Sequence, residues 1–441
     1  MTRSEGVPAF VDHLFRRTAG QMVSTLTRIL GTRHLDLAED VVQEALIRAL
    51  EQWPFRGIPE NPTAWLIEVA KNRALDRLRR DASLASKRDD LLAAFPAVTA
   101  AGFEPAYPFQ THWLRDDQLA MMFLCCHPEI PEESRVALTL KTVGGFSVKE
   151  IARAFLSDEA AVAQRIVRAK RQIRERAIDL GVPVGAALLD RLDSVLGVLY
   201  LMFNEGYLSR GSGSGEDSHA PGLIREDVCN EALRLGLLLA SYGATDLPKV
   251  HALLALFYFH SSRFASRVSA EGDLVALADQ DRAKWDRSRI EQGLLHLTAS
   301  AEGDEESDYH LEAAIASAHA VAADVASTDW GYITTLYESL FQRKATPVVA
   351  LNRAIAIGYG RGPEAGLAAL REIELHPSLA NYYLLFASQA HFCELLSFRS
   401  EAAELYRAAL ACECAPAERR LLERRLDRVY PSSSAIPEKN L

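Results

Sequence analysis

Residues 62–80 read PTAWLIEVAKNRALDRLRR, and this stretch decides the fold expected for the chain. Apolar residues recur in it at helical spacing, which predicts an amphipathic helix with one buried face. Cations fill the rest of the helix, and Trp65 and Asn72 stand nearer its start. Cations bind a nucleic-acid backbone, an aromatic ring stacks on a base, and an amide can read a base edge. The expected cations are Lys71, Arg73, Arg77, Arg79 and Arg80.

Residues 132–178 carry a second DNA-binding pattern, that of a helix-turn-helix. Ser147 and Glu150 form a capping box for one helix, and Gly144 and Gly145 end the helix before it. The following helix has an apolar stripe, and polar and basic residues surround that stripe, as insertion into a major groove requires. An ordinary helical hairpin with a solvated basic face gives the same pattern. The residues around the stripe are Gln164, Arg165, Arg168, Lys170, Arg171 and Arg174.

The net charge of -10 is distributed unevenly along the chain. Residues 179–441 hold 24 Lys and Arg against 36 Asp and Glu, whereas residues 118–178 hold 10 against 7. The acidity therefore belongs to the C-terminal half. The N-terminal half concentrates its cations on two helices, which suits local contact with phosphates.

Composition and patterning predict an all-α protein. Convincing period-2 strands are absent from the sequence, and helices are expected at roughly 8–30, 36–53, 62–81, 115–126, 132–143, 148–156 and 158–178. The first ten residues lack the apolar core of a signal peptide, and the longest uncharged apolar run, 250–262, is too short to span a bilayer. Six cysteines in 441 residues do not form a disulfide framework. A soluble cytoplasmic protein is expected.

The last hundred residues indicate helical repeats. Helical segments at 349–356 and 365–373 are followed by similar segments at 390–396 and 402–411, rich in small residues. A period of roughly 34 residues is typical of tetratricopeptide-like helix pairs. We therefore expect a C-terminal helical-repeat domain.

With these motifs in place, the chain resembles bacterial RNA polymerase sigma factors of the extracytoplasmic-function type, in the sigma-70 family. Residues 37–46 resemble the region 2 helix that binds core polymerase, residues 62–80 the helix that melts and reads the -10 element, and residues 135–174 region 4, which reads the -35 element. Residues 123–128, 163–170 and 199–207 also resemble a subgroup with a long tetratricopeptide-like extension. The resemblance implies region 2 at 1–84, a linker at 85–117, region 4 at 118–180 and a regulatory extension at 181–441.

The resemblance also implies roles for single residues. Residues 53–61 correspond to a loop that holds a flipped -10 base; within it Trp53 is expected in the core. Arg73, Arg77 and Arg80 are expected to hold phosphates, and Asp76 is expected to orient one of these three arginines. The -10 contacts are expected at Arg56, Asn61, Trp65, Lys71, Asn72, Arg73, Asp76, Arg77 and Arg80. The -35 contacts are expected at Lys149, Gln164, Arg165, Arg168, Lys170 and Arg171. An acidic and amide face that binds core polymerase is expected at Asp36, Glu39, Asp40, Gln43 and Glu44.

The same resemblance implies three partners: core RNA polymerase, promoter DNA, and a protein on the extension such as a small DGPF-type protein of the YCII-related class. The sequence leaves open whether the extension inhibits or is required for activity. No cofactor or metal is expected, because Cys125, Cys126 and His127 lack a second ligand pair at zinc spacing. Two other functions stay open: a helix-turn-helix regulator that acts without polymerase, and an enzyme that uses Asn204 and Glu205.

Overall fold

The computed structural model describes residues 6–84, 111–155, 157–207, 224–269 and 272–430. Within these ranges the chain forms helices and a single isolated bridge, Val268–Leu274, but no strand, so the all-α prediction is confirmed. The chain divides into two compact units, residues 1–202 and 203–441. The division falls inside α10 (Ala186–Tyr207), so this helix contributes to both units.

The first unit contains the helices expected for the two DNA-binding modules. Their bounds differ from the predicted ones by a few residues; the largest difference is α6, which begins at residue 111, inside the stretch expected to be a linker. Residues 85–110 of that stretch lie outside the described residues. The helices are α1 (Gly6–Leu30), η1 (Thr32–His34), α2 (Leu35–Arg56), α3 (Pro62–Leu84), α6 (Thr111–Cys125), α7 (Glu132–Thr142), α8 (Val148–Ala154) and α9 (Glu159–Glu175).

Local chemistry explains where these helices begin and end. Gly57 has φ 82° and ends α2, and its N–H donates to the Trp53 carbonyl at 3.0 Å. The predicted capping box of α8 is present: the Glu150 N–H donates to Ser147 Oγ at 3.2 Å, and the Ser147 N–H donates to Glu150 Oε2 at 2.8 Å. This confirms the predicted start of the helix.

The helices of the first unit pack against one another. α1 packs on α2 and α6, α2 on α3, and α7 on α9. At the contact between α1 and α7, a Cβ placed on Gly20 would lie 1.8 Å from the Val143 carbonyl oxygen. The backbones of the expected region 2 and region 4 therefore approach as closely as a glycine allows.

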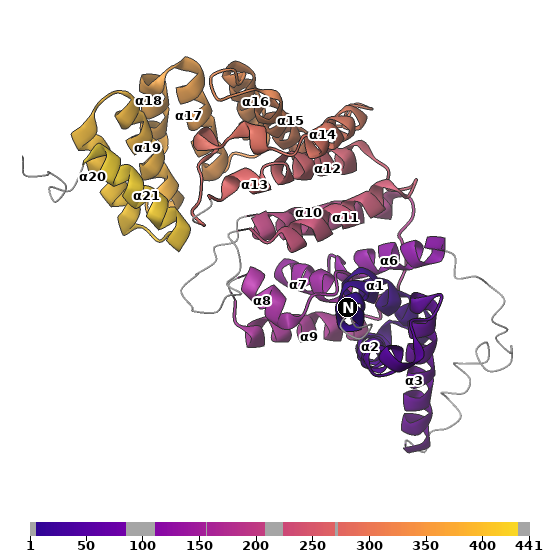
Figure 1. Cartoon of the computed structure of the whole chain (residues 1–441). Coiled ribbons are helices and arrows are strands. Elements are labelled where there is room, and N and C mark those ends of the chain that lie inside the picture. Colours follow the sequence, from indigo (N-terminus) through magenta and orange to yellow (C-terminus); the bar gives the residue numbers. More distant parts are fainter. Residues whose placement is uncertain (1–5, 85–110, 156, 208–223, 270–271, 431–441) are drawn as a thin grey trace, which may run out of the picture. The chain divides into compact units, whose positions relative to one another are not determined.

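In the second unit α12 packs against both α14 and α15, and from α16 to α21 each helix packs mainly against its neighbours in the chain. Figure 1 shows this succession from α12 to α21. Such nearest-neighbour packing is the property that defines helical-repeat proteins. The helices are α11 (Glu226–Ala240), α12 (Pro248–Ser261), α13 (Phe264–Arg267), η2 (Leu277–Asp279), η3 (Arg282–Lys284), α14 (Arg287–Ser300), α15 (Asp308–Val321), α16 (Trp330–Arg343), α17 (Pro347–Arg361), α18 (Pro363–Ile373), η4 (Pro377–Leu379), α19 (Tyr383–Leu395), α20 (Arg399–Ala411) and α21 (Pro416–Val429).

The pair α17 and α18 is repeated by the pair α19 and α20. Both helices recur at one spacing, since α17 and α19 begin at Pro347 and Tyr383, and α18 and α20 at Pro363 and Arg399. Small residues stand where the helices cross: a Cβ on Gly366 would lie 2.5 Å from the Gly358 Cα. The predicted helical repeat is confirmed.

Candidate nucleic-acid and polymerase interface

The basic face of α3 lies against the acidic face of α2. Arg77 pairs with Asp40, with 3.2 Å between Nη1 and Oδ2, and its other terminal nitrogen pairs with Glu44. Arg73 lies 4.0 Å from the same Glu44 carboxylate. Residues expected to contact -10 DNA and residues expected to contact polymerase therefore neutralise one another within region 2.

Trp65, the aromatic residue at the start of α3, packs in part against another tryptophan. Trp53 is buried, which confirms its expected core position, and the half-buried Trp65 ring lies 5.5 Å from it, centroid to centroid. Asn72 and Arg80 are exposed farther along α3, and Lys71 is half-buried. The Asn72 side chain is therefore more exposed than the Trp65 ring.

The loop expected to hold a flipped base is shorter than predicted. Because α2 continues to Arg56, only residues 57–61 separate α2 from α3, and Arg56 is an exposed helix end. Asn61 caps α3, since its Oδ1 accepts the Ala64 N–H at 3.0 Å. Asp76 Oδ1 lies 3.9 Å from Arg79 Nη1 of the same helix.

The predicted recognition helix α9 has the expected two faces. Its apolar stripe, Val162, Ile166, Ala169 and Ile173, is buried. Gln164, Arg168 and Arg171 are exposed, as is Lys149 on α8. Arg165 pairs with Glu133 of α7 at 3.3 Å, and Arg171 with Glu175 of its own helix at 3.6 Å.

Two cations of α9 bind the face of α2 that is expected to bind polymerase. Lys170 Nζ lies 2.8 Å from Asp36 Oδ1 and 3.0 Å from Glu39 Oε2, and Arg174 lies 3.1 Å from Asp36. Burial tends to lower the pKa of Lys170, but the Glu39 and Asp36 carboxylates outweigh it and raise that pKa. Lys170 is therefore a charged, nearly buried cation.

Glu39 connects α2 to the helix-turn-helix by a further bond. Thr142, the last residue of α7, donates its hydroxyl to Glu39 Oε1 at 2.9 Å, so both carboxylate oxygens of Glu39 are used. Gln43 and Asp40 are exposed on the same helix. Sequence reasoning selected Glu39 and Lys170 for two different partners and missed their contact; the opposite charges of the two helices were the available signal.

Cys125 and Cys126 lie in the packed interior, and Gly206, next to the candidate enzymatic residue Glu205, packs on α11. Cys125 and Cys126 are buried, and burial raises the pKa of Cys126 to about 11, which disfavours the thiolate that a metal needs. No group of three or more metal-ligating side chains is found among the described residues. Gly206, beside Glu205, packs closely on α11, because a Cβ there would lie 2.9 Å from the Arg225 carbonyl oxygen.

Family comparisons agree with the positions of these helices. The model of sigma-70 region 2 matches residues 14–83, which include α2 and the described basic face of α3, and that of sigma-70 region 4 matches residues 120–173, which include α7, α8 and most of α9. The chain belongs to the sigma-70 family, as an extracytoplasmic-function sigma factor with a C-terminal extension. Within the extension of this sigma factor, residues 191–301 match a family of unknown function, DUF6596.

One relative matches this sigma factor over nearly its whole length, and others match only about a third of it. An uncharacterized protein of Rhizobium meliloti is 35% identical over 92% of this chain and 93% of that protein. The probable RNA polymerase sigma factor RfaY of Xanthomonas campestris is 28% identical over 36% of this chain and 39% of that protein. The sigma factor SigW of Bacillus subtilis is 28% identical over 35% of this chain and 81% of that protein. No solved structure matches the chain. None of the helices in the described ranges is long and apolar enough to cross a membrane.

Proposed function

We propose that this sigma factor binds core RNA polymerase through α2 and directs it to promoters, with α3 reading the -10 element and α9 the -35 element. The observation that carries the proposal is the pair of basic helices, each with exposed side chains that can reach bases or phosphates. Asn72 supplies such a group on α3, and Gln164 and Arg168 supply them on α9. The phosphate contacts supply affinity, and the amides supply contact with base edges.

In this proposal, the arrangement of the first unit is the form that the sigma factor takes before it binds polymerase. Lys170 and Arg174 occupy Asp36 and Glu39 of the face that would bind polymerase. A basic surface of the polymerase would compete with these two cations for the same carboxylates. Binding of polymerase would thereby release α9 from α2 and let the two DNA-binding helices reach separated promoter elements.

Run-off transcription with purified core polymerase on a library of promoter fragments tests this function. Initiation should depend on the protein and fall with Asn72→Ala or Arg168→Ala. Glu68→Ala is a matched control, because Glu68 is an exposed residue of α3 that carries no positive charge or amide. Tight binding to duplex DNA without any initiation would contradict the proposal and favour a helix-turn-helix regulator that acts without polymerase.

We also propose that the second unit controls the activity of the first. Its acidity makes it a competitor for the basic helices, whereas its fixed repeat structure suits a required scaffold or a protein partner. A YCII-related partner stays a prediction. In this role the protein is not an enzyme; it acts in the cytoplasm, where it would meet polymerase and DNA.

Truncated proteins show whether the second unit inhibits activity or is required for it, provided that the truncation leaves the first unit intact. The end point matters because Ser194 of α10 accepts a hydrogen bond from Arg135 at 2.9 Å and donates one to the Cys126 carbonyl at 2.7 Å. A protein of residues 1–207 keeps both bonds, whereas residues 1–184 lack them. Higher output from residues 1–207 than from the full chain means inhibition by the second unit, and lower output means a required role. Equal output would contradict the proposed control.

A further inference from the structure

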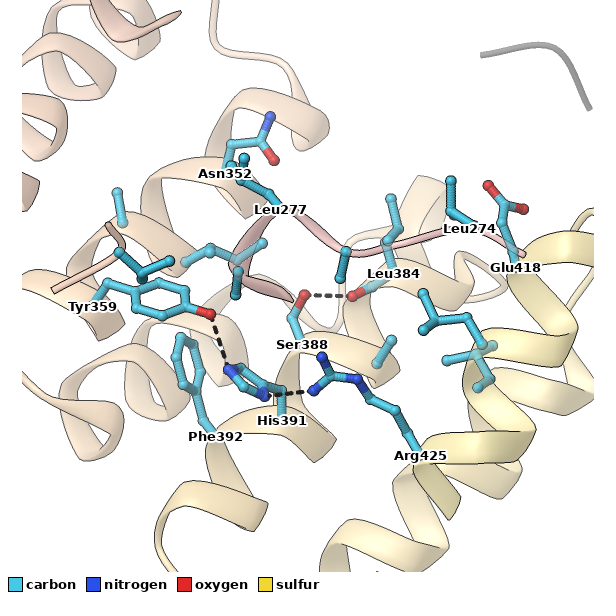
Figure 2. Close-up of a pocket in the computed structure, with 18 of the residues that line it drawn as sticks. Leu274, Leu277, Asn352, Tyr359, Leu384, Ser388, His391, Phe392, Glu418 and Arg425 are labelled. Atoms are coloured by element: carbon cyan, nitrogen blue, oxygen red, sulfur yellow. Dashed lines mark hydrogen bonds between the residues drawn. The ribbon is translucent and has the colours of Figure 1, made fainter. Parts of the chain in front are cut away.

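The second unit contains a pocket of about 420 Å³ that the sigma-factor function does not use. Figure 2 shows it between a loop that includes Leu274 and Leu277 and the helices α17, α19 and α21. Most of its lining is apolar or aromatic. Its volume lies in the range of small-molecule sites. The lining includes Trp330, Tyr359, Leu384, Ala387 and Phe392.

One wall of the pocket is a loop that ion pairs hold in place. Asp273 pairs with Arg420 of α21 at 2.7 Å and also with Arg424, and Asp279 pairs with Arg425 at 2.7 Å. The loop residues Leu274 and Leu277, which lie beside these carboxylates in the chain, line the pocket. The loop therefore bounds the space with a fixed wall, as suits a compact small molecule.

Several polar groups of the lining already form hydrogen bonds with one another. The Tyr359 hydroxyl lies 2.9 Å from His391 Nε2, and Arg425 donates to His391 Nδ1 at 3.1 Å, as the dashed lines in Figure 2 show. Burial first, and Arg425 second, lower the pKa of His391, so this imidazole stays neutral. Asp279 and, at 3.9 Å, Glu394 balance the charge of Arg425. Arg425 therefore already faces two carboxylates and offers no unpaired positive charge to a ligand.

Arg282, which also lines the pocket, has a different environment. It is only 6% exposed, and it donates to the carbonyl oxygens of His319 at 2.7 Å and Ala322 at 2.9 Å and to Thr328 Oγ1 at 3.1 Å. Its buried Nε has no partner among the described residues. These acceptors are neutral. The exposed Asp324 carboxylate interacts with Arg282 electrostatically and accepts the Ser327 N–H at 2.7 Å.

A nearly buried cation whose hydrogen-bond acceptors are all neutral favours an anion nearby. We propose that the pocket binds a small amphipathic acid, with its apolar body among Trp330, Tyr359 and Phe392 and its anionic group toward Arg282. Burial of the apolar body supplies affinity, and the anion compensates the arginine. This binding involves the second unit alone and does not depend on the function proposed for the first.

Two fluorescent probes with the same ring skeleton test the charge preference of the full-length protein. 8-Anilinonaphthalene-1-sulfonate carries an anion, and N-phenyl-1-naphthylamine lacks it. We expect saturable binding of one sulfonate probe per chain, accompanied by a change in tryptophan emission, with at least about tenfold higher affinity than the neutral probe, equivalent to about 1.4 kcal/mol. Equal affinities, or binding that does not saturate, would overturn the proposal.

Matched variants locate the probe. Ala387→Phe on α19 fills the pocket and should weaken binding of the sulfonate probe at least about tenfold. Ala368→Phe makes the same change at an exposed site on α18 outside the lining and should leave binding unchanged. Arg282→Gln should reduce affinity for the sulfonate probe more than for the neutral one. Unchanged binding in Ala387→Phe would refute the assigned site, and if Arg282→Gln fails to fold, the probe ratio of the unmodified protein decides the charge preference.

Discussion

Lys170 of α9 lies with its ammonium nitrogen 3.0 Å from Glu39 Oε2 of α2, and both side chains are only 10% exposed. The pair joins the helix expected to read the -35 element to the helix expected to bind polymerase. A nearly buried ion pair is costly to break from one side, because the remaining charge loses its partner but stays desolvated.

Lys170→Ala should therefore destabilise the first unit by about 3 kcal/mol, the lower end of the range for breaking a buried pair. Arg171→Ala is the matched control, since its pair with Glu175 is exposed and should be worth less than about 0.5 kcal/mol. Denaturant unfolding followed by circular dichroism measures both. Similar small losses in the two variants would show that the buried pair does not hold the helices together.

The same variant should bind core polymerase more tightly if α9 masks α2. Removal of the Lys170 ammonium leaves Asp36 and Glu39 available to another cation. Biolayer interferometry with immobilised core polymerase would measure the change against Arg171→Ala. A weaker interaction in Lys170→Ala would mean that the closed arrangement helps polymerase binding.

Gly20→Ala should destabilise the first unit by about 1–3 kcal/mol, the usual cost of overpacking. The new Cβ would lie 1.8 Å from the backbone oxygen of Val143, and backbone cannot rotate away as a side chain can. Gly181→Ala has no atom within 4 Å of the added carbon and serves as the control. Thermal melts should separate the two variants; coincident melts would show that α1 and α7 separate readily.

Arg168→Ala should lower the slope of log affinity against log salt concentration by about 0.9, the effect of one lost phosphate contact on duplex DNA. Arg168 is exposed on α9, so folding stability should change little. Val167→Ala alters an exposed, uncharged neighbour on the same helix and should leave the slope unchanged. Fluorescence anisotropy over a salt series measures the slopes, and an unaltered slope in Arg168→Ala would remove this residue from the DNA interface.

Acid should destabilise the second unit through His260. Burial first, and Arg263 next, lower the pKa of His260 from 6.5 to about 3. Above pH 6.5 the histidine is neutral in both states. Below it the unfolded chain binds a proton that the folded chain refuses, so stability falls down to about pH 3. At pH 5 the loss from this residue is about 2 kcal/mol.

His260→Phe should remove that part of the pH dependence, because Phe keeps a ring beside Phe203 and Tyr207 but does not titrate. The exposed His376→Phe is the control. Melting temperatures between pH 7 and pH 5 measure the effect. A pH dependence equal to that of the unmodified protein would show that His260 takes up its proton without unfolding.

Sequence periodicity was enough to predict the helices and the buried stripe of α9, because both depend on residues close together in the chain. The start of α3 at residue 62 was predicted, but Asn61 was assigned to DNA contact and its capping of the helix was missed. Lys170 and Glu39 are far apart in sequence, and any of several acids could have paired with any of several cations. The apolar lining of the pocket is drawn from Leu274 to Leu422, and in sequence such residues look like ordinary core.

The ion pair between Lys170 and Glu39 joins α9 to α2. Breaking this pair to free one helix therefore also frees the other, and the coupling between the two helices is reciprocal. Whatever free energy polymerase spends in freeing Glu39 is also spent in freeing Lys170, and DNA that captures α9 lowers the cost of polymerase binding by the same amount. If the proposed function holds, polymerase and DNA should therefore bind cooperatively although the proposal gives them different residues. Promoter occupancy would then rise more steeply with polymerase concentration on fragments that carry a -35 element than on fragments that lack one.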